Sequence, residues 1–127
     1  MKNKFKWLFE LKGVRGVLLV GSHARGEASK DSDIDLVILT DTPSDLLNTT
    51  DWTNQFGRIQ KIEQEDWGLV QSLRVHYENG DEIEYGITTR EWAGVNPIDK
   101  GTREVLKGGH QILFDPESIF KKISEKL

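Results

Sequence analysis

The sequence contains no cysteine, only three prolines and no long apolar run. The absence of cysteine excludes disulfides and thiolate chemistry. Because the three histidines are scattered, we do not expect a zinc site. The longest apolar segments, residues 17–20 and 36–39, are far shorter than a membrane span, and no apolar signal core follows the basic N-terminus. These absences predict a cytoplasmic protein that has no contact with a membrane.

Length and charge narrow the class of protein further. The chain has 127 residues, of which 36% are hydrophobic and 30% are charged, as is typical of a folded globular chain. We therefore expect a single domain over residues 1–127. Its formal net charge of −4 disfavours nonspecific binding to a nucleic-acid backbone, which usually requires a basic face.

Hydrophobic periodicity predicts interleaved strands and helices. The pattern predicts strands over residues 14–20, 34–39, 59–65, 69–77, 81–88 and 110–114. Helical segments are expected over residues 3–12, 22–27, 42–56, 89–93 and 102–107 and after Asp115-Pro116. This order predicts an α+β (α/β) fold, with a mixed β-sheet flanked by helices.

The fourth and fifth predicted strands form a hairpin around Asn79-Gly80. Apolar residues occupy odd positions in both strands, so a two-residue loop would place Val75 opposite Glu84 and mix the two faces. A three-residue loop pairs odd with odd positions. We therefore expect a three-residue turn with Gly80 in the left-handed region, an apolar face and a polar face.

The chemically informative stretch begins where the first buried strand ends, at Gly21-Ser22. Glycine allows a close approach of the backbone, and the free N–H groups of a following helix together with the Ser22 hydroxyl favour an anion. Asp33 and Asp35 follow at the start of the next strand, and positions two apart on a strand share a face. Two adjacent carboxylates repel unless cations lie between them, and two Mg²⁺ ions about 3.5–4 Å apart suit such a pair.

The combination of Gly21-Ser22, a short helix and Asp33-Ile34-Asp35 resembles the signature of the DNA polymerase beta-like nucleotidyltransferase superfamily. The segments Gly-Ser-His-Ala-Arg-Gly and Ser-Asp-Ile-Asp-Leu are similar to those of small bacterial nucleotidyltransferases. These include minimal antitoxin-like members and the catalytic domains of aminoglycoside adenylyltransferases. The resemblance is specific over residues 17–39, looser up to residue 88, and implies a nucleotidyltransferase fold.

The resemblance also implies site residues. A third carboxylate is expected on a later strand, and Glu84 fits this position, with Glu82 as the second choice. The competing interpretation of Glu84 is that of a cross-strand partner for Arg74 or His76. Many members of the superfamily have aspartate here. Asp33, Asp35 and Glu84 would hold two Mg²⁺ ions, and Glu84 would act as general base.

The implied substrate is a nucleoside triphosphate, ATP or another NTP. The resemblance places the terminal phosphates at Gly21 and Ser22. Arg25 either contacts a phosphate or pairs with Glu27 or Asp31. None of the four tryptophans is singled out by its spacing as a partner of the nucleobase.

The leading functional hypothesis is metal-dependent transfer of a nucleoside monophosphate, AMP in the first instance, to a hydroxyl group with release of pyrophosphate. The acceptor is either a small molecule or a protein side chain. Because larger similar enzymes carry a helical domain that helps to bind the acceptor, we expect a homodimer or a helical partner protein here. The alternative is a non-catalytic nucleotide-binding or antitoxin-type module on the same fold, and the three retained carboxylates argue against it.

Overall fold

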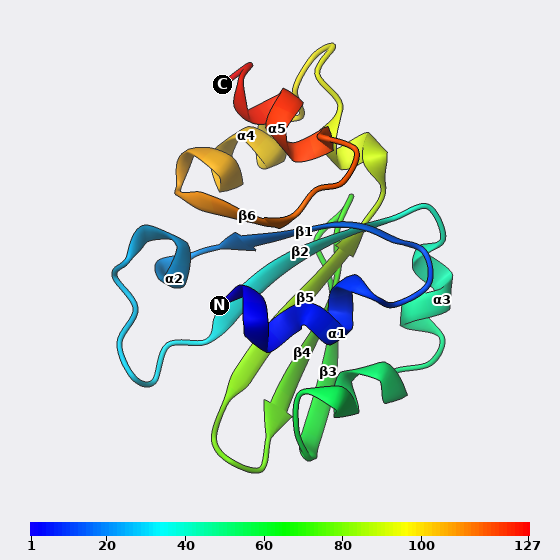
Figure 1. The fold of residues 1–127 in the computed structure, drawn as a ribbon, viewed down its shortest axis with the longest axis vertical. Helices are drawn as coiled ribbons and strands as arrows, with labels where there is room; N and C mark the ends of the chain where they lie inside the picture. The colour runs from blue at the N-terminus through cyan, green and yellow to red at the C-terminus, as the bar shows by residue number, and fades with distance from the viewer.

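The computed structural model describes residues 1–127 and has one six-stranded sheet at its centre (Figure 1). Its strands are β1 (Val14–Val20), β2 (Ile34–Thr40), β3 (Ile59–Asp66), β4 (Gln71–Tyr77), β5 (Glu82–Thr88) and β6 (His110–Phe114). They lie side by side in the order β3-β4-β5-β2-β1-β6. β2 and β5 are parallel, and the other neighbouring pairs are antiparallel. The mixed sheet flanked by helices that the sequence predicted is confirmed.

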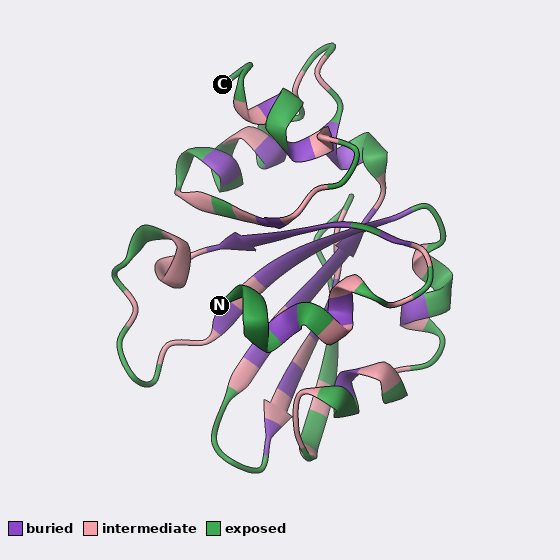
Figure 2. Ribbon diagram, viewed as in Figure 1, coloured by how far each residue is buried: buried purple, intermediate pink, exposed green.

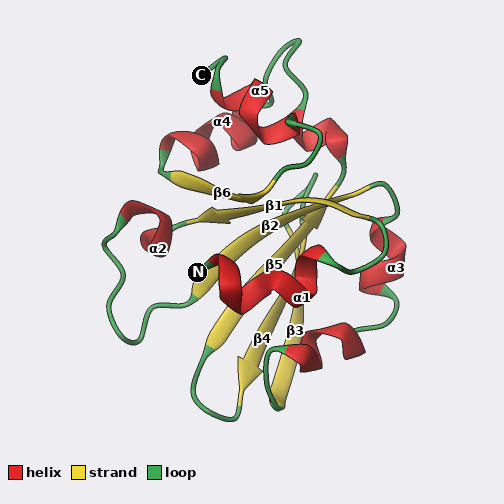
Figure 3. Cartoon of the chain, in the orientation of Figure 1, coloured by secondary structure: helices red, strands yellow, loops and turns green.

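Short helices lie on both faces of this sheet (Figure 3). The α-helices are α1 (Lys6–Phe9), α2 (Ser22–Arg25), α3 (Pro43–Leu47), α4 (Lys100–Lys107) and α5 (Ile119–Ser124), and the 3-10 helices are η1 (Lys2–Phe5), η2 (Asp51–Gln55) and η3 (Arg90–Ala93). Side chains of η1, α1, α3 and η2 pack on one face, and those of η3, α4 and α5 pack on the other. None of these helices has the length and apolar character needed to cross a bilayer.

β1 and β2 are buried on both faces, which explains their nearly uninterrupted apolar sequences. Leu19 and Ile38 point into the core that contains α1, whereas Leu18 and Val37 point into the second core beneath α4 and α5. Figure 2 shows both strands buried along most of their length, whereas β3 is largely exposed. Polar residues can therefore face solvent on β3, on β4 and at the beginning of β5, whereas the later residues of β1, β2 and β5 are buried.

The β4–β5 hairpin has the predicted phase. Val75 lies opposite Ile83, and the three residues 78–80 form the loop, with Gly80 at a φ of 95°. The same register places Arg74 directly opposite Glu84 on the other face. The expected three-residue turn is confirmed, and it determines which charged side chains meet across the two strands.

The helix predicted over residues 42–56 is wrong as one element, because it is divided into α3 and η2. The indole Nε1 of Trp52 donates to the carbonyl of Leu46 at 2.9 Å, and Thr53 Oγ1 donates to the carbonyl of Thr50 at 2.7 Å. These side chains take carbonyl groups that a continuous helix would use for its own backbone. The helix predicted over residues 3–12 is also shorter and ends at Phe9.

The C-terminal helix begins three residues later than the Asp115-Pro116 pair predicted. α5 starts at Ile119, and the carboxylate of Asp115 accepts hydrogen bonds from the backbone N–H groups of Ile119, Phe120 and Lys121 at 2.8, 3.2 and 2.9 Å. Asp115 therefore accepts hydrogen bonds from the free N–H groups at the start of α5, although it does not occupy the N-cap position of this helix.

Candidate active site

The site is built at the end of β1, where Gly21 turns the chain into the single helical turn α2. Gly21 has a φ of 75°, in the region that favours glycine. A Cβ atom at this position would collide with the carboxylate of Asp35 on the neighbouring strand. Both the turn and the close approach thus require glycine, and Gly21 brings the backbone before α2 into contact with the acidic residues of β2.

Three carboxylates converge beside this turn. Asp33 immediately precedes β2, Asp35 lies within β2, and Glu84 lies opposite Asp35 on the parallel strand β5. One carboxylate oxygen from each residue lies within 4.8 Å of the others. We call these three residues the acid cluster. The two aspartates share a face as the sequence predicted, and the pairing of β2 with β5 adds Glu84.

Asp35 is the member of the acid cluster whose surroundings are least favourable for a free carboxylate. Its Oδ1 is buried and has no hydrogen-bond partner. Burial and the negative charges of Asp33 and Glu84 raise the pKa of Asp35 to about 7. A cation bound to these carboxylates would offset the repulsion. The acid cluster therefore has the donor set and the electrostatic need that suit a divalent metal ion.

Glu82 lies on the same face of β5 as Glu84 but makes different contacts. Its Oε2 accepts a hydrogen bond from Arg74 Nη1 at 2.7 Å, and its Oε1 lies 3.1 Å from His76 Nδ1. Glu84, in contrast, lies beside Asp33 and Asp35. The geometry thus brings Glu84, rather than Glu82, into the acid cluster.

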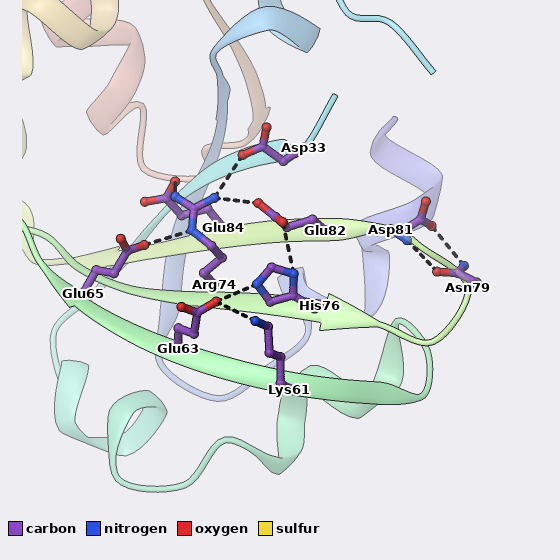
Figure 4. A network of polar contacts seen from close by, with 10 residues as sticks. All are labelled: Asp33, Lys61, Glu63, Glu65, Arg74, His76, Asn79, Asp81, Glu82 and Glu84. Carbon is purple, nitrogen blue, oxygen red and sulfur yellow. Dashed lines mark hydrogen bonds and ion pairs between the residues drawn. The ribbon is translucent and has the colours of Figure 1, made fainter. Parts of the chain in front are cut away.

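A single guanidinium group borders the acid cluster (Figure 4). Arg74 pairs with four carboxylates, with N–O distances of 3.2 Å to Asp33, 3.0 Å to Glu65, 2.7 Å to Glu82 and 3.0 Å to Glu84. Burial alone would lower the pKa of Arg74, but hydrogen bonds to Glu82 and Glu65 raise it above its usual range. The predicted cross-strand pair of Arg74 and Glu84 is therefore present, and it coexists with the place of Glu84 in the acid cluster.

The short helix α2 is tied to its surroundings by its own polar residues. His23 Nε2 lies 3.2 Å from the carbonyl of Ser32. Arg25 donates to Glu27 at 3.2 Å and to the carbonyl of Gly108 at 3.1 Å, so the predicted pairing with Glu27 is present. Ser32 Oγ accepts from the backbone N–H of Ser29 in the turn before β2.

A cavity of about 460 Å³ adjoins the acid cluster. Part of its lining comes from residues of the site, namely Gly21, Arg25, Asp35 and Glu84. The lining also includes the apolar side chains of Val70, Trp92, Val105 and Trp67. Its volume lies within the range of small-ligand sites. A group that enters it can contact the carboxylates and an apolar surface at the same time.

Sequence reasoning missed the particular position of Trp67 in this cavity. Trp7 and Trp52 pack against the first core, and Trp92 is buried in the second. Trp67, in contrast, is 61% exposed in the turn between β3 and β4. The neighbouring Gly68 is typical of a turn, but no spacing in the sequence links this turn to the acid cluster.

Comparison with known proteins identifies the family. A family model described as a nucleotidyltransferase domain matches residues 1–87, which is more than half of the chain. This chain therefore belongs to the nucleotidyltransferase domain family, and the expected membership of the polymerase beta-like superfamily is confirmed. It follows that the protein is a transferase.

The fold is similar to that in the crystal structure of an aminoglycoside 6-adenyltransferase from Bacillus subtilis. The TM-score is 0.57 at 15% sequence identity, and the match covers 73% of this chain and 35% of that protein. At this identity the likeness concerns the fold alone, and this chain corresponds to about a third of the length of that enzyme. A comparison with curated proteins gave no match.

Proposed function

We propose that this chain transfers a nucleoside monophosphate, AMP from ATP, to the hydroxyl group of an acceptor and releases pyrophosphate. The observation that carries this proposal is the acid cluster, in which one carboxylate oxygen from each of Asp33, Asp35 and Glu84 lies within 4.8 Å of the others and the buried Oδ1 of Asp35 has no hydrogen-bond partner. The turn at Gly21, which contacts Asp35, lies beside it. A cation-binding group next to a position for phosphates suits a metal-bound triphosphate.

The three residues of the acid cluster would hold Mg²⁺, and two ions are expected. When bound, the metal supplies charge neutralisation for the triphosphate and lowers the pKa of the acceptor hydroxyl. The unpartnered Oδ1 and the raised pKa of Asp35 support this assignment, since both describe a carboxylate that lacks a positive partner.

The reaction follows from the proposed roles of the protein side chains. Glu84 accepts the proton of the acceptor hydroxyl. The hydroxyl oxygen forms a bond to the α-phosphorus, the bond from that phosphorus to the bridging oxygen breaks, and pyrophosphate leaves. Gly21 and Ser22 would hold the terminal phosphates, with Arg25 at their side, so that the reacting atoms are aligned.

We place the nucleoside in the cavity beside the acid cluster. Gly21 and Arg25 line this cavity together with Trp67, Val70 and Val105, so a nucleotide whose phosphates lie at Gly21 can extend along an apolar surface. The exposed ring of Trp67 offers a face for the base, and such stacking contributes about 1–3 kcal/mol per base.

The acceptor would approach from the polar face of β3, β4 and β5, which no helix covers. We propose that residues 1–127 act as one catalytic domain and that a second copy or a helical partner protein completes the acceptor surface over this open face. The acceptor is either a small molecule or a protein side chain. We expect the reaction to occur in the cytoplasm and not to involve a nucleic acid as partner.

The proposal is tested with ATP labelled at the α-phosphate, incubated with Mg²⁺ and cell extract. The wild type is expected to transfer label to an acceptor, whereas Asp33→Asn combined with Asp35→Asn is expected to transfer none. Asp31→Asn is the matched control, because Asp31 is exposed, lies close in sequence and is outside the acid cluster. Labelling that persists in the double variant contradicts the proposal, and nucleotide binding without any transfer favours the non-catalytic module.

A further inference from the structure

The guanidinium of Arg74 occupies a bridging position at the acid cluster. Nη1 lies 3.2 Å from Asp33 Oδ2, and Nη2 lies 3.0 Å from Glu84 Oε2. Arg74 is the one cationic side chain within ion-pair distance of either residue. One monovalent cation thus partners two of the three carboxylates that would hold a metal ion, and it leaves Asp35 Oδ1 without a partner.

Two further carboxylates fix Arg74 in this place. Its Nε donates to Glu65 of β3 at 3.0 Å, and its Nη1 donates to Glu82 of β5 at 2.7 Å. His76 lies 3.1 Å from Glu82, and the Arg74 side chain is only 23% exposed. Figure 4 shows the guanidinium among the carboxylates of Asp33, Glu65, Glu82 and Glu84. Glu65 and Glu82 do not belong to the acid cluster, so Arg74 remains anchored when the oxygens of Asp33 and Glu84 take another partner.

We propose that Arg74 is a built-in counter-cation that pairs with Asp33 and Glu84 in the nucleotide-free chain. It weakens the binding of free divalent ions to the acid cluster and favours the binding of metal that arrives as the metal–nucleotide complex. This inference rests on the proposed metal-binding function of the acid cluster. The anchored positive charge repels a free dication and competes with it for the same oxygens. A magnesium–triphosphate complex carries a net negative charge, so the same guanidinium attracts it. Arg74 therefore sets the order in which metal and nucleotide bind.

The test is titration of Mn²⁺ and of the Mn²⁺–ATP complex into the purified chain by calorimetry. Arg74→Gln is expected to bind free Mn²⁺ at least about tenfold more tightly than the wild type and to bind Mn²⁺–ATP more weakly. Arg74→Lys keeps the positive charge and is expected to remain within about threefold of the wild type for free Mn²⁺. Arg58→Gln is the matched control, since Arg58 is 90% exposed and pairs only with Glu78 at 3.8 Å, and it is expected to bind both ligands as the wild type does.

Removal of Arg74 leaves Glu65 and Glu82 without their partner, so the fold of Arg74→Gln is checked by circular dichroism. If this variant does not fold, Arg74→Gln is combined with Glu82→Gln, which removes one of the two carboxylate charges left without a partner. The double variant is likewise expected to bind free Mn²⁺ more tightly than the wild type and Mn²⁺–ATP more weakly. An affinity for free Mn²⁺ that is unchanged or weaker in the folded variant overturns the role of Arg74. A wild type that binds neither Mn²⁺ nor Mn²⁺–ATP overturns the metal site itself, and with it the proposed function.

Discussion

Replacement of Asp35 by asparagine tests the electrostatics of the acid cluster in the metal-free chain. Burial and the charges of Asp33 and Glu84 raise the pKa of Asp35 from 3.8 to about 7. The folded chain therefore binds this proton more tightly than the unfolded chain does. It follows that the free energy of unfolding falls as the pH rises from about 4 to about 7 and that the loss is then complete. Asp35→Asn removes this loss because the amide does not ionise.

The size of the effect follows from the same shift. The change from 3.8 to about 7 would amount to about 4 kcal/mol at full value. Because solvent reaches part of this carboxyl group, screening reduces the contribution, and we expect about 1–2 kcal/mol at pH 8. In a chain of this length that corresponds to an increase in Tm of roughly 4–8 °C.

The assay is thermal unfolding at pH 4.5 and pH 8 in the presence of a chelator. Asp35→Asn is expected to be more stable than the wild type at pH 8 and close to it at pH 4.5, whereas the exposed control Asp31→Asn is expected to match the wild type at both. Added Mg²⁺ at pH 8 should stabilise the wild type and have little effect on Asp35→Asn. An asparagine variant that is less stable at pH 8, or a difference that does not depend on pH, would refute the reasoning.

Three further substitutions test other parts of the structure. Gly21→Ala is expected to lower the free energy of unfolding in urea by about 1–3 kcal/mol, because alanine is strained at a φ of 75° and its Cβ meets Asp35; an unchanged midpoint would contradict the close approach. Trp67→Ala should leave Tm unchanged and weaken nucleotide binding by about 1–3 kcal/mol in calorimetry. An affinity equal to that of the wild type would show that the base does not bind in this cavity. Tyr85→Phe should cost about 1 kcal/mol in the same urea assay, because it deletes the 2.8 Å hydrogen bond to the hydroxyl of Tyr77, and a neutral result would mean that this bond adds no stability.

Those parts of the site that depend on local pattern could be predicted from the sequence. The period of two in β4 and β5 determined which residues face each other, so it correctly paired Val75 with Ile83 and thereby placed Arg74 opposite Glu84. The spacing of Asp33 and Asp35 placed both on one face of β2 for the same reason.

Features that depend on contacts between distant segments could not be predicted. Glu65 meets Arg74 because β3 pairs with β4 in one particular register, and the polar side chains of β3 do not specify that register. The break between α3 and η2 depends on the hydrogen bond from Trp52 to the carbonyl of Leu46, which competes with helix formation after the chain has folded. The cavity that Trp67 and Val105 of α4 both line likewise depends on where the turn between β3 and β4 lies relative to α4, which no local pattern describes.

The central claim is that the acid cluster binds a nucleotide through divalent metal. The most direct measurement is calorimetric titration of a non-hydrolysable ATP analogue with and without Mg²⁺, into the wild type and into Asp33→Asn combined with Asp35→Asn. Tight binding by the wild type that requires Mg²⁺, and its loss in the double variant, is the predicted result. Equal affinity in both proteins, with or without the ion, would contradict the claim.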